Sequence, residues 1–168
     1  RPGPRAAPAF LLGFPRSGTT LLDTFLMGHT RVRVLEEQPL LGHVTAVLGS
    51  FERLAGVEPT EVEALRQTYF DRLSEYVEPG FAGLVVDKNP VNTLGIPLIH
   101  LLFPDAKLIF VQRHPCDCVL SGLMQNFHPN PAMASFLDPR AAADFYDVTL
   151  EVWTRSRDLL PLTVHIMR

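Results

Sequence analysis

Two glycines near the start of the chain, Gly13 and Gly18, have the spacing of the phosphate-binding loop G-x-x-x-x-G-K-[ST]. Thr19 stands in place of the usual lysine, and Thr20 follows it. The backbone N–H groups of such a loop face an anion, the two hydroxyls add donors, and Arg16 adds a permanent charge. Because the missing lysine normally reaches the β/γ-phosphates of a nucleoside triphosphate, we expect a phosphate-like ligand other than a triphosphate. The alternative is a strand–turn–helix without a ligand.

Three positively charged side chains, Arg16, Lys88 and Arg113, each follow a short apolar segment that is typical of a buried strand. The carboxyl ends of parallel strands meet at one edge of a sheet, and ligands of such sheets bind there. We therefore expect these three side chains to converge on one site.

Apolar segments alternate with helical patterns along the chain, which predicts an α/β fold with a central parallel sheet and helices on both faces. A capping box, Thr60 to Glu63, is expected to begin one of the helices. The predicted strands are residues 9–12, 31–35, 83–87, 107–112 and 162–167, and the predicted helices are residues 19–28, 40–54, 60–76, 94–103, 115–125 and 139–159.

The composition is that of a globular chain long enough for one domain with a sizeable core, with 168 residues, 46% of them hydrophobic. Residues 1–8 are expected to form a linker and residues 9–168 the domain. The net charge of −3 implies no broad basic surface for nucleic acid, and no apolar run approaches a membrane span. Cys116 and Cys118 are too close together for a favourable disulfide, so we expect a reducing, cytoplasmic environment.

A second phosphate site is suggested by Arg113 and Ser121, which lie at the entrance of a predicted helix and two turns into it. The guanidinium and the hydroxyl could together bind a phosphate separate from the one in the glycine loop. The alternative is structural: Arg113 could pair with Asp117, and Ser121 could be a small helix-packing residue.

The chain resembles the sulfotransferases, most closely the tyrosylprotein sulfotransferases and related bacterial domains. The segment Pro15-Arg-Ser-Gly-Thr-Thr-Leu21 is similar to their 5′-phosphosulfate loop, and Arg113 to Ser121 is similar to their 3′-phosphate segment. The resemblance implies a P-loop-kinase-like three-layer fold and 3′-phosphoadenosine 5′-phosphosulfate as the sulfuryl donor. It also implies that the donor is bound by Arg16, Ser17, Gly18, Thr19, Thr20, Arg113 and Ser121.

The resemblance also implies catalytic residues. Glu36-Glu37 stands where the tyrosylprotein group carries its glutamate pair, so Glu37 is the candidate general base. Lys88 matches a lysine near the bridging oxygen, and with Arg16 it would stabilise the transferred group. No metal site is expected, because the sulfuryl group carries less charge than a phosphoryl group. The glutamates could instead be a negatively charged helix entrance, and Lys88 a solvated loop residue.

Three histidines, His29, His43 and His100, are alternative bases, since other sulfotransferases use histidine. The sequence departs from the tyrosylprotein pattern at Pro39 and Gln125, where that group has arginines. The group uses the arginine that Pro39 replaces on acidic peptide substrates, so this departure puts tyrosylprotein specificity in doubt.

The acceptor therefore stays open between protein tyrosine, a carbohydrate and a small alcohol or phenol. The acceptor cleft is expected between the loop 126–138 and the helices of residues 40–77, with Phe51, Phe127 and Phe136 as possible lining residues or core. The resemblance implies further segments beyond Arg168. Two other functions compete: a P-loop kinase or NTPase, for which Asp87 is the one evident metal-holding acid, and an inactive nucleotide-binding module.

Overall fold

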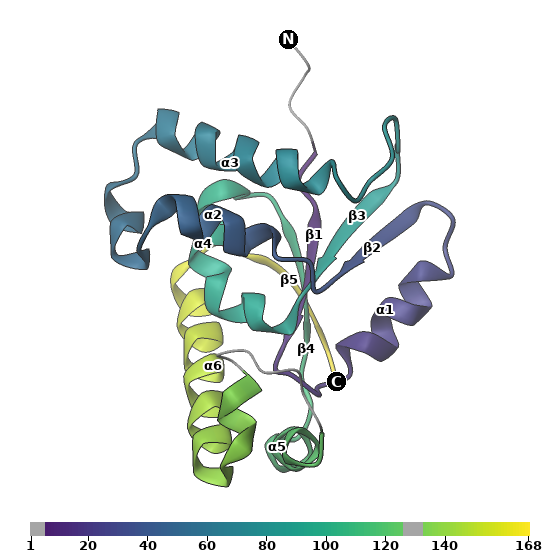
Figure 1. The fold of residues 1–168 in the computed structure, drawn as a ribbon, viewed down its shortest axis with the longest axis vertical. Coiled ribbons are helices and arrows are strands. Elements are labelled where there is room, and N and C mark those ends of the chain that lie inside the picture. The colour runs from purple at the N-terminus through teal and green to yellow at the C-terminus, as the bar shows by residue number, and fades with distance from the viewer. Residues whose placement is uncertain (1–5, 126–132) are drawn as a thin grey trace.

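The computed structural model describes residues 6–125 and 133–168, and its centre is a five-stranded parallel sheet in the order β2-β3-β1-β4-β5 (Figure 1). The α/β class and the parallel sheet are thereby confirmed, and each predicted strand is present to within a residue at either end. Parts of the predicted linker (residues 1–5) and of the predicted loop (126–132) lie outside the described residues. The strands are β1 (Ala9–Gly13), β2 (Val32–Glu36), β3 (Leu84–Lys88), β4 (Lys107–Val111) and β5 (Thr163–Met167).

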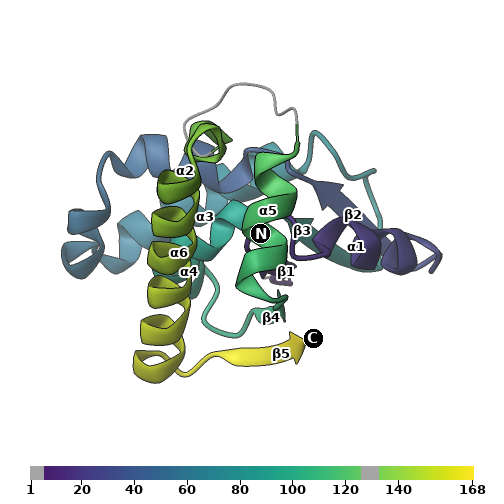
Figure 2. The same cartoon turned by 90° about the horizontal axis from the view of Figure 1, so that it is seen from below.

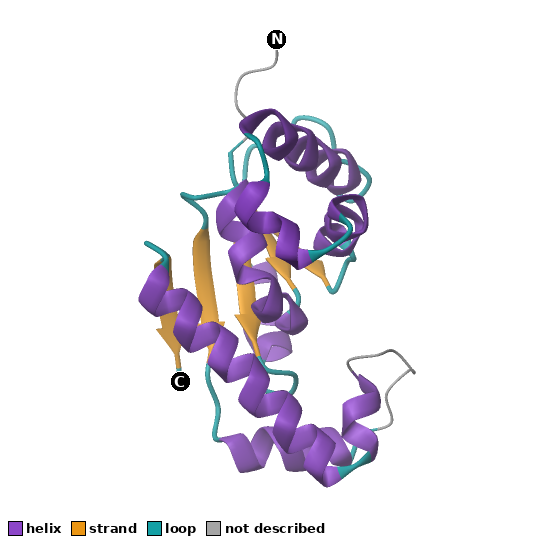
Figure 3. Cartoon of the chain, turned by 90° about the vertical axis from the view of Figure 1, so that its left-hand side faces the viewer, coloured by secondary structure: helices purple, strands orange, loops and turns teal. Residues whose placement is uncertain are grey.

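Helices lie on both faces of the sheet, with α1 beside β2 on one face and α2, α3, α4 and α6 on the other (Figures 1 and 3). Seen from below, α5 lies in front of the sheet and alongside α6 (Figure 2). None of the described helices has the length and hydropathy needed to cross a membrane. The α-helices are α1 (Thr19–Met27), α2 (Leu40–Leu48), α3 (Pro59–Leu73), α4 (Ile96–Leu102), α5 (Pro115–Leu123) and α6 (Pro139–Leu159), and the 3₁₀ segments are η1 (Phe51–Gly56), η2 (Pro90–Gly95) and η3 (Met133–Leu137).

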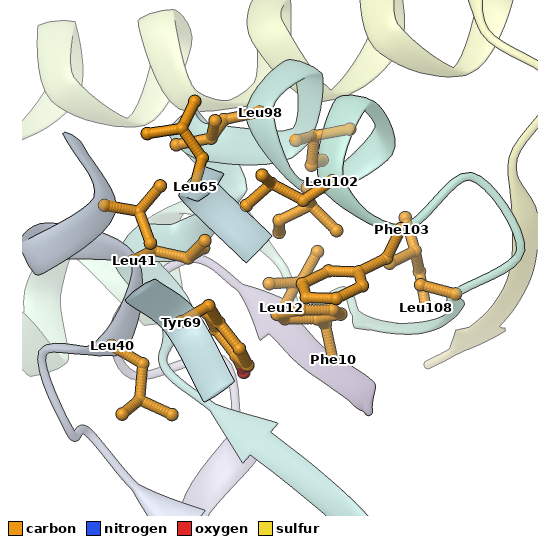
Figure 4. Packing of buried hydrophobic residues seen from close by; sticks show 14 of the residues in the cluster. Phe10, Leu12, Leu40, Leu41, Leu65, Tyr69, Leu98, Leu102, Phe103 and Leu108 are labelled. Carbon is orange, nitrogen blue, oxygen red and sulfur yellow. The ribbon is translucent and has the colours of Figure 1, made fainter. Parts of the chain in front are cut away.

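The central strand β1 is buried along its whole length, as its unbroken apolar sequence predicts for a strand covered on both faces. Phe10 and Leu12 point to the α2–α3–α4 side, where they pack with Leu65, Leu102 and Phe103 (Figure 4). Burying each such side chain contributes about 1.5–3 kcal/mol. This packing fixes the position at which β1 ends, and so the position of the loop that follows it.

Some predicted helix boundaries are wrong. Thr60 does not cap α3, because the helix already begins at Pro59, whose fixed φ suits a first helical turn, with Glu58 as the N-cap residue. The helix predicted for residues 40–54 ends at Leu48, because Gly49 follows with a φ of 86° and a separate 3₁₀ segment comes after it. Asp138 caps α6, since its side chain accepts a hydrogen bond from the Ala141 backbone N–H at 2.9 Å.

Thr93 in η2 fastens the end of β1 to the segment that follows β3. Its hydroxyl donates to the carbonyl of Gly13 at 2.8 Å and accepts from the Gly13 N–H at 3.1 Å, and it also lies 2.8 Å from the carbonyl of Pro90. The side chain is fully buried, so these backbone groups have no access to water. Thr93 therefore holds the start of the glycine loop against η2.

A buried acid lies at the end of β3. Asp87 is fully buried and accepts a hydrogen bond from the hydroxyl of Tyr69 at 2.7 Å, which comes from α3. Desolvation raises the pKa of Asp87 to about 7, although the Tyr69 hydrogen bond acts in the opposite direction. Burial and the neighbouring carboxylate also raise the pKa of Tyr69. A carboxyl that prefers to be protonated in the folded state penalises folding once the pH is high enough to ionise it.

We expect Thr93→Val to lower the free energy of unfolding by about 2 kcal/mol, because it leaves buried backbone groups of Gly13 without a partner while it conserves side-chain volume. Urea unfolding measures this loss. Thr45→Val is the matched control, since the Thr45 hydroxyl donates to the carbonyl of Leu41 within its own helix. Equal losses in the two variants would contradict the fastening role of Thr93.

We expect Asp87 to make the protein less stable as the pH rises from about 4 to about 7. Because the folded-state pKa is raised from 3.8, its stabilising effect is complete below the unfolded-state pKa and is lost through the folded-state pKa. Asp87→Asn should therefore match the wild type near pH 4 and exceed it at pH 8, by at most about 4 kcal/mol. Urea unfolding across this pH range measures the difference. A difference that does not change with pH would refute the assignment, whereas Tyr69→Phe should move the loss to higher pH.

Candidate active site

The glycine loop between β1 and α1 has the geometry that its sequence predicts. Gly18 precedes α1 with a φ of 107°, a conformation that favours glycine. A Cβ on Gly13 would lie 2.6 Å from the Ser17 Oγ and 2.7 Å from the carbonyl oxygen of Val111, so this position admits no side chain without a shift. The loop thus brings the backbone close to β4 and presents the N-terminus of α1.

The Ser17 hydroxyl is a buried polar group for which the described residues supply no hydrogen-bond partner. Buried hydroxyls are normally hydrogen-bonded, because leaving one unpaired costs about 1–3 kcal/mol. An anion held in the loop would satisfy this hydroxyl. The loop residues therefore fit a bound phosphate group.

The two predicted phosphate segments contact each other directly. The Arg16 Nε donates to the Ser121 Oγ at 3.1 Å, although the two residues are 105 positions apart in the sequence. Arg113 donates from Nη1 to the Arg16 carbonyl at 3.2 Å. Arg113 also pairs with Asp117 at 3.5 Å, which is the contact of the structural alternative, and these two side chains are 46% and 56% exposed. The structure therefore brings Arg16, Arg113 and Ser121 together at the carboxyl edge of β1 and β4.

Lys88 is the centre of a second group of charges. Its ammonium lies 2.9 Å from Glu36, 3.3 Å from Glu37 and 3.2 Å from Asp23, and the side chain is fully buried. Burial alone would lower the pKa of Lys88, but the hydrogen bond to Glu36 and the charges of Glu37 and Asp23 raise it overall. The Thr20 hydroxyl of the glycine loop lies 3.4 Å from the ammonium and joins the two groups. Lys88 is thus a charged residue within the fold and not a solvated loop lysine.

The predicted glutamates lie where β2 ends, next to Lys88. Glu36 and Lys88 are register partners on neighbouring strands, and the Glu37 N–H donates to the Lys88 carbonyl at 2.7 Å. The side chains of Glu36 and Glu37 are 56% and 60% exposed, so each can meet a ligand. Glu37 has a φ of 51°, and Arg16 is the other non-glycine residue with a positive φ in the described part of the chain. Backbone strain of this kind concentrates at functional sites.

Sequence reasoning missed Asp23. Leu21 and Phe25 of α1 are 65% and 72% exposed, whereas Asp23 is 1% exposed. The helix packs on the sheet through Leu22 and Leu26, and Asp23, next to Leu22, is buried with them. Asp23 lies four residues after Thr19 and therefore on the same side of the helix. This spacing was the one signal in the sequence that could have placed Asp23 at the site.

The other residues that the sequence offered as bases, metal-holding acids or cleft-lining residues mostly lie away from this site or pack in the core. His29 and His100 precede the amino ends of β2 and β4, so they lie at the opposite edge of the sheet, whereas His43 is partly buried in α2, which begins three residues after Glu37. Asp87, the acid that a kinase would need, points to Tyr69 in the core. Phe136 is buried against Phe14, which makes it a core residue.

Phe127 lies outside the described residues, and Phe51 is 42% exposed in η1. Both cysteines are free; Cys116 is exposed, and Cys118 is buried in α5. Within the described residues, no group of three or more His, Cys, Asp or Glu side chains is arranged to hold a metal ion.

Comparison with curated proteins gives relatives over part of this chain. It is 32% identical over 136 residues to an uncharacterized protein of Aquifex aeolicus, which covers 74% of this chain and 18% of that protein. It is 28% identical over 114 residues to protein-tyrosine sulfotransferase 2 of Gallus gallus, which covers 62% of this chain and 30% of that protein. The chain therefore spans less than a third of the length of these two relatives.

Two solved structures share the fold. The sulfotransferase STF9 from Mycobacterium avium superposes with a TM-score of 0.61 at 17% identity, covering 98% of this chain and 59% of that one. The sulfotransferase domain from the curacin biosynthetic pathway superposes with a TM-score of 0.63 at 22% identity, covering 98% of this chain and 68% of that one. These likenesses confirm the predicted P-loop-like fold. The model of the sulfotransferase family matches residues 8–167, and the chain therefore belongs to the sulfotransferase family.

Proposed function

We propose that the chain binds 3′-phosphoadenosine 5′-phosphosulfate and transfers its sulfuryl group to an acceptor hydroxyl. The observation that carries this proposal is the contact between the two phosphate segments through Arg16 and Ser121. A nucleotide with phosphates at both the 5′ and the 3′ positions needs two anion sites at a short, fixed separation. A mononucleotide phosphate would need only the glycine loop.

The residues of the loop would hold the 5′ end of the donor. Gly18, Thr19 and Thr20 begin α1 and direct backbone N–H groups at an anion, and the unpartnered Ser17 hydroxyl adds a donor. Arg113, which lies two residues before α5, and Ser121, in the last turn of α5, would bind the 3′-phosphate. For this, Arg113 exchanges its exposed partner Asp117 for the phosphate.

The donor supplies a sulfuryl group that is activated by its bond to a phosphate. In the transfer, the sulfur–oxygen bond to that phosphate breaks, a bond to the acceptor oxygen forms, and Glu37 takes the acceptor's proton. Arg16 and Lys88 would stabilise the negative charge on the leaving and equatorial oxygens. Because Lys88 is covered in the ligand-free arrangement, the exposed side chains of Glu36 and Glu37 must turn aside for its ammonium to reach the donor.

The acceptor is a hydroxyl on protein tyrosine, a carbohydrate or a small alcohol or phenol. One relative is a protein-tyrosine sulfotransferase by its name. Pro39, at the start of α2, offers no cation for acidic residues around a tyrosine. A panel of acceptors, including neutral and acidic tyrosine peptides, is therefore the relevant search.

We expect calorimetry to show tight binding of 3′,5′-bisphosphoadenosine, unaffected by EDTA, and much weaker binding of 5′-AMP and Mg-ATP. Arg113→Ala should remove most of the preference for the bisphosphate over 5′-AMP, because it deletes a charge-assisted contact worth about 1.5–3 kcal/mol. Arg155→Ala is the control, since Arg155 is exposed on α6 and pairs with Glu151 of the same helix. Preference for Mg-ATP would point to a kinase instead, and unchanged selectivity in Arg113→Ala would remove the 3′-phosphate assignment.

We expect Glu37→Gln to lower kcat for sulfuryl transfer by about 10²–10⁴-fold, because the amide cannot take the acceptor's proton. Affinity for 3′,5′-bisphosphoadenosine should stay close to that of the wild type. Glu61→Gln, at a partly exposed glutamate that pairs with Arg53, is the matched control and should keep full activity. Bisphosphate binding without transfer, in the wild type and in Glu37→Gln alike, would indicate an inactive nucleotide-binding module.

A further inference from the structure

Asp23 lies beneath Lys88 in a position unlike that of the two glutamates. It belongs to the middle of α1, is 1% exposed, and places its Oδ2 3.2 Å from the Lys88 ammonium. In the described part of the chain no hydrogen bond to this oxygen is present, so the ion pair with Lys88 is its polar contact. The other oxygen, Oδ1, accepts a distant hydrogen bond of 3.4 Å from Thr24.

Side chains along β3 alternate between the two faces of the sheet, and this explains the contact between Lys88 and Asp23. Val86 and Lys88 face the same side of the sheet, and Val86 packs in the cluster that α1 covers with Leu22 and Leu26. Asp23 is adjacent to Leu22 on that helix, so the lysine at the end of β3 meets the carboxylate. The contact is part of the packing of α1 on the sheet and does not depend on a mobile loop.

The three carboxylates around Lys88 differ in exposure, so they cannot have the same role. Glu36 and Glu37 are more than half exposed, and under the proposed function Glu37 must face the acceptor and take its proton. Asp23 is enclosed and has no route to the acceptor. When the glutamates turn toward substrates, Asp23 remains as the negative charge that balances the buried ammonium. An unbalanced buried charge would cost several kcal/mol.

We propose that Asp23 is a positioning residue, which keeps Lys88 protonated and directs its ammonium toward the sulfuryl donor. This assignment rests on the proposed function for its catalytic consequence, whereas the contact itself can be tested on the ligand-free protein. Asp23 does not touch the reacting atoms in this scheme and acts through Lys88.

Direct observation of Lys88 is practical because the chain has two lysines, Lys88 and Lys107. Labelling lysine with ¹³C at the ε-carbon gives two signals whose shifts follow protonation, and Lys107, exposed at the start of β4, is the internal reference. Asp23→Asn, which conserves shape, should lower the pKa of Lys88 by about one to three pH units and leave that of Lys107 unchanged. Asp23→Glu should restore the charge and most of the wild-type pKa.

The kinetic arm uses the same variants. Asp23→Asn should lower kcat about 10- to 100-fold with little change in KM for the donor, and should move the alkaline limb of the pH–kcat profile to lower pH. Asp87→Asn is the matched control: it removes a neighbouring buried carboxylate that faces Tyr69, and should shift neither the Lys88 signal nor that limb. If Asp23→Asn does not fold, Asp23→Ser carries the same measurements, and Asp23→Glu stays the variant that keeps the charge.

The outcomes separate the two proposals. A Lys88 pKa that is the same in Asp23→Asn as in the wild type would overturn the role of Asp23, whatever the activity. A lowered Lys88 pKa with an unmoved alkaline limb would also overturn it, since the contact would then be structural only. A wild-type protein that binds no bisphosphate and transfers no sulfuryl group would overturn the proposed function, while the Lys88 titration would still decide whether Asp23 holds the ammonium.

Discussion

A fully buried ammonium at the end of β3 requires the surrounding elements to supply negative charge. Lys88 is removed from water, so its charge must be balanced by partners at short distance. Asp23 from α1 and the two glutamates at the end of β2 supply them. This requirement fixes the approach of α1 to the sheet and the register of β2 against β3. The same packing sets where the glycine loop presents its N–H groups, because α1 begins directly after that loop.

The strained backbone conformations in the site occur next to firmly anchored strand ends. Arg16 and Glu37 adopt positive φ values that cost about 1–3 kcal/mol each, and both follow strands that are anchored firmly. Thr93 ties the end of β1 to the segment after β3, and the Lys88 carbonyl accepts the Glu37 N–H. Rigid strand ends can hold such conformations, whereas a flexible loop would relax them. The packing and hydrogen bonds that anchor the strand ends therefore offset the backbone strain at Arg16 and Glu37.

The sequence sufficed for the elements and for the edge at which the charged residues meet, because apolar strands and glycine spacing are local signals. It did not suffice for the partner of Lys88. Leu21 and Phe25 are exposed, because α1 packs on the sheet through Leu22 and Leu26. The same face of the helix carries Asp23 inward. The Tyr69–Asp87 pair was equally hidden, because the two residues lie on different elements that only the packed core brings together. The predicted capping box was wrong because Pro59, directly before Thr60, begins the helix.

The site has two halves of opposite charge, joined by the Thr20 hydroxyl at 3.4 Å from the Lys88 ammonium. Arg16 and Arg113 make one half basic, which suits a nucleotide with several negative charges. In the other half, one ammonium faces three carboxylates, so the excess charge is negative. An anionic acceptor would be repelled at short range by this half, whereas a neutral hydroxyl would not. Under the proposed function, the charge pattern therefore orients the two substrates as well as binding them: the donor is drawn to the arginines, and the acceptor approaches from the glutamate side, where its proton is taken.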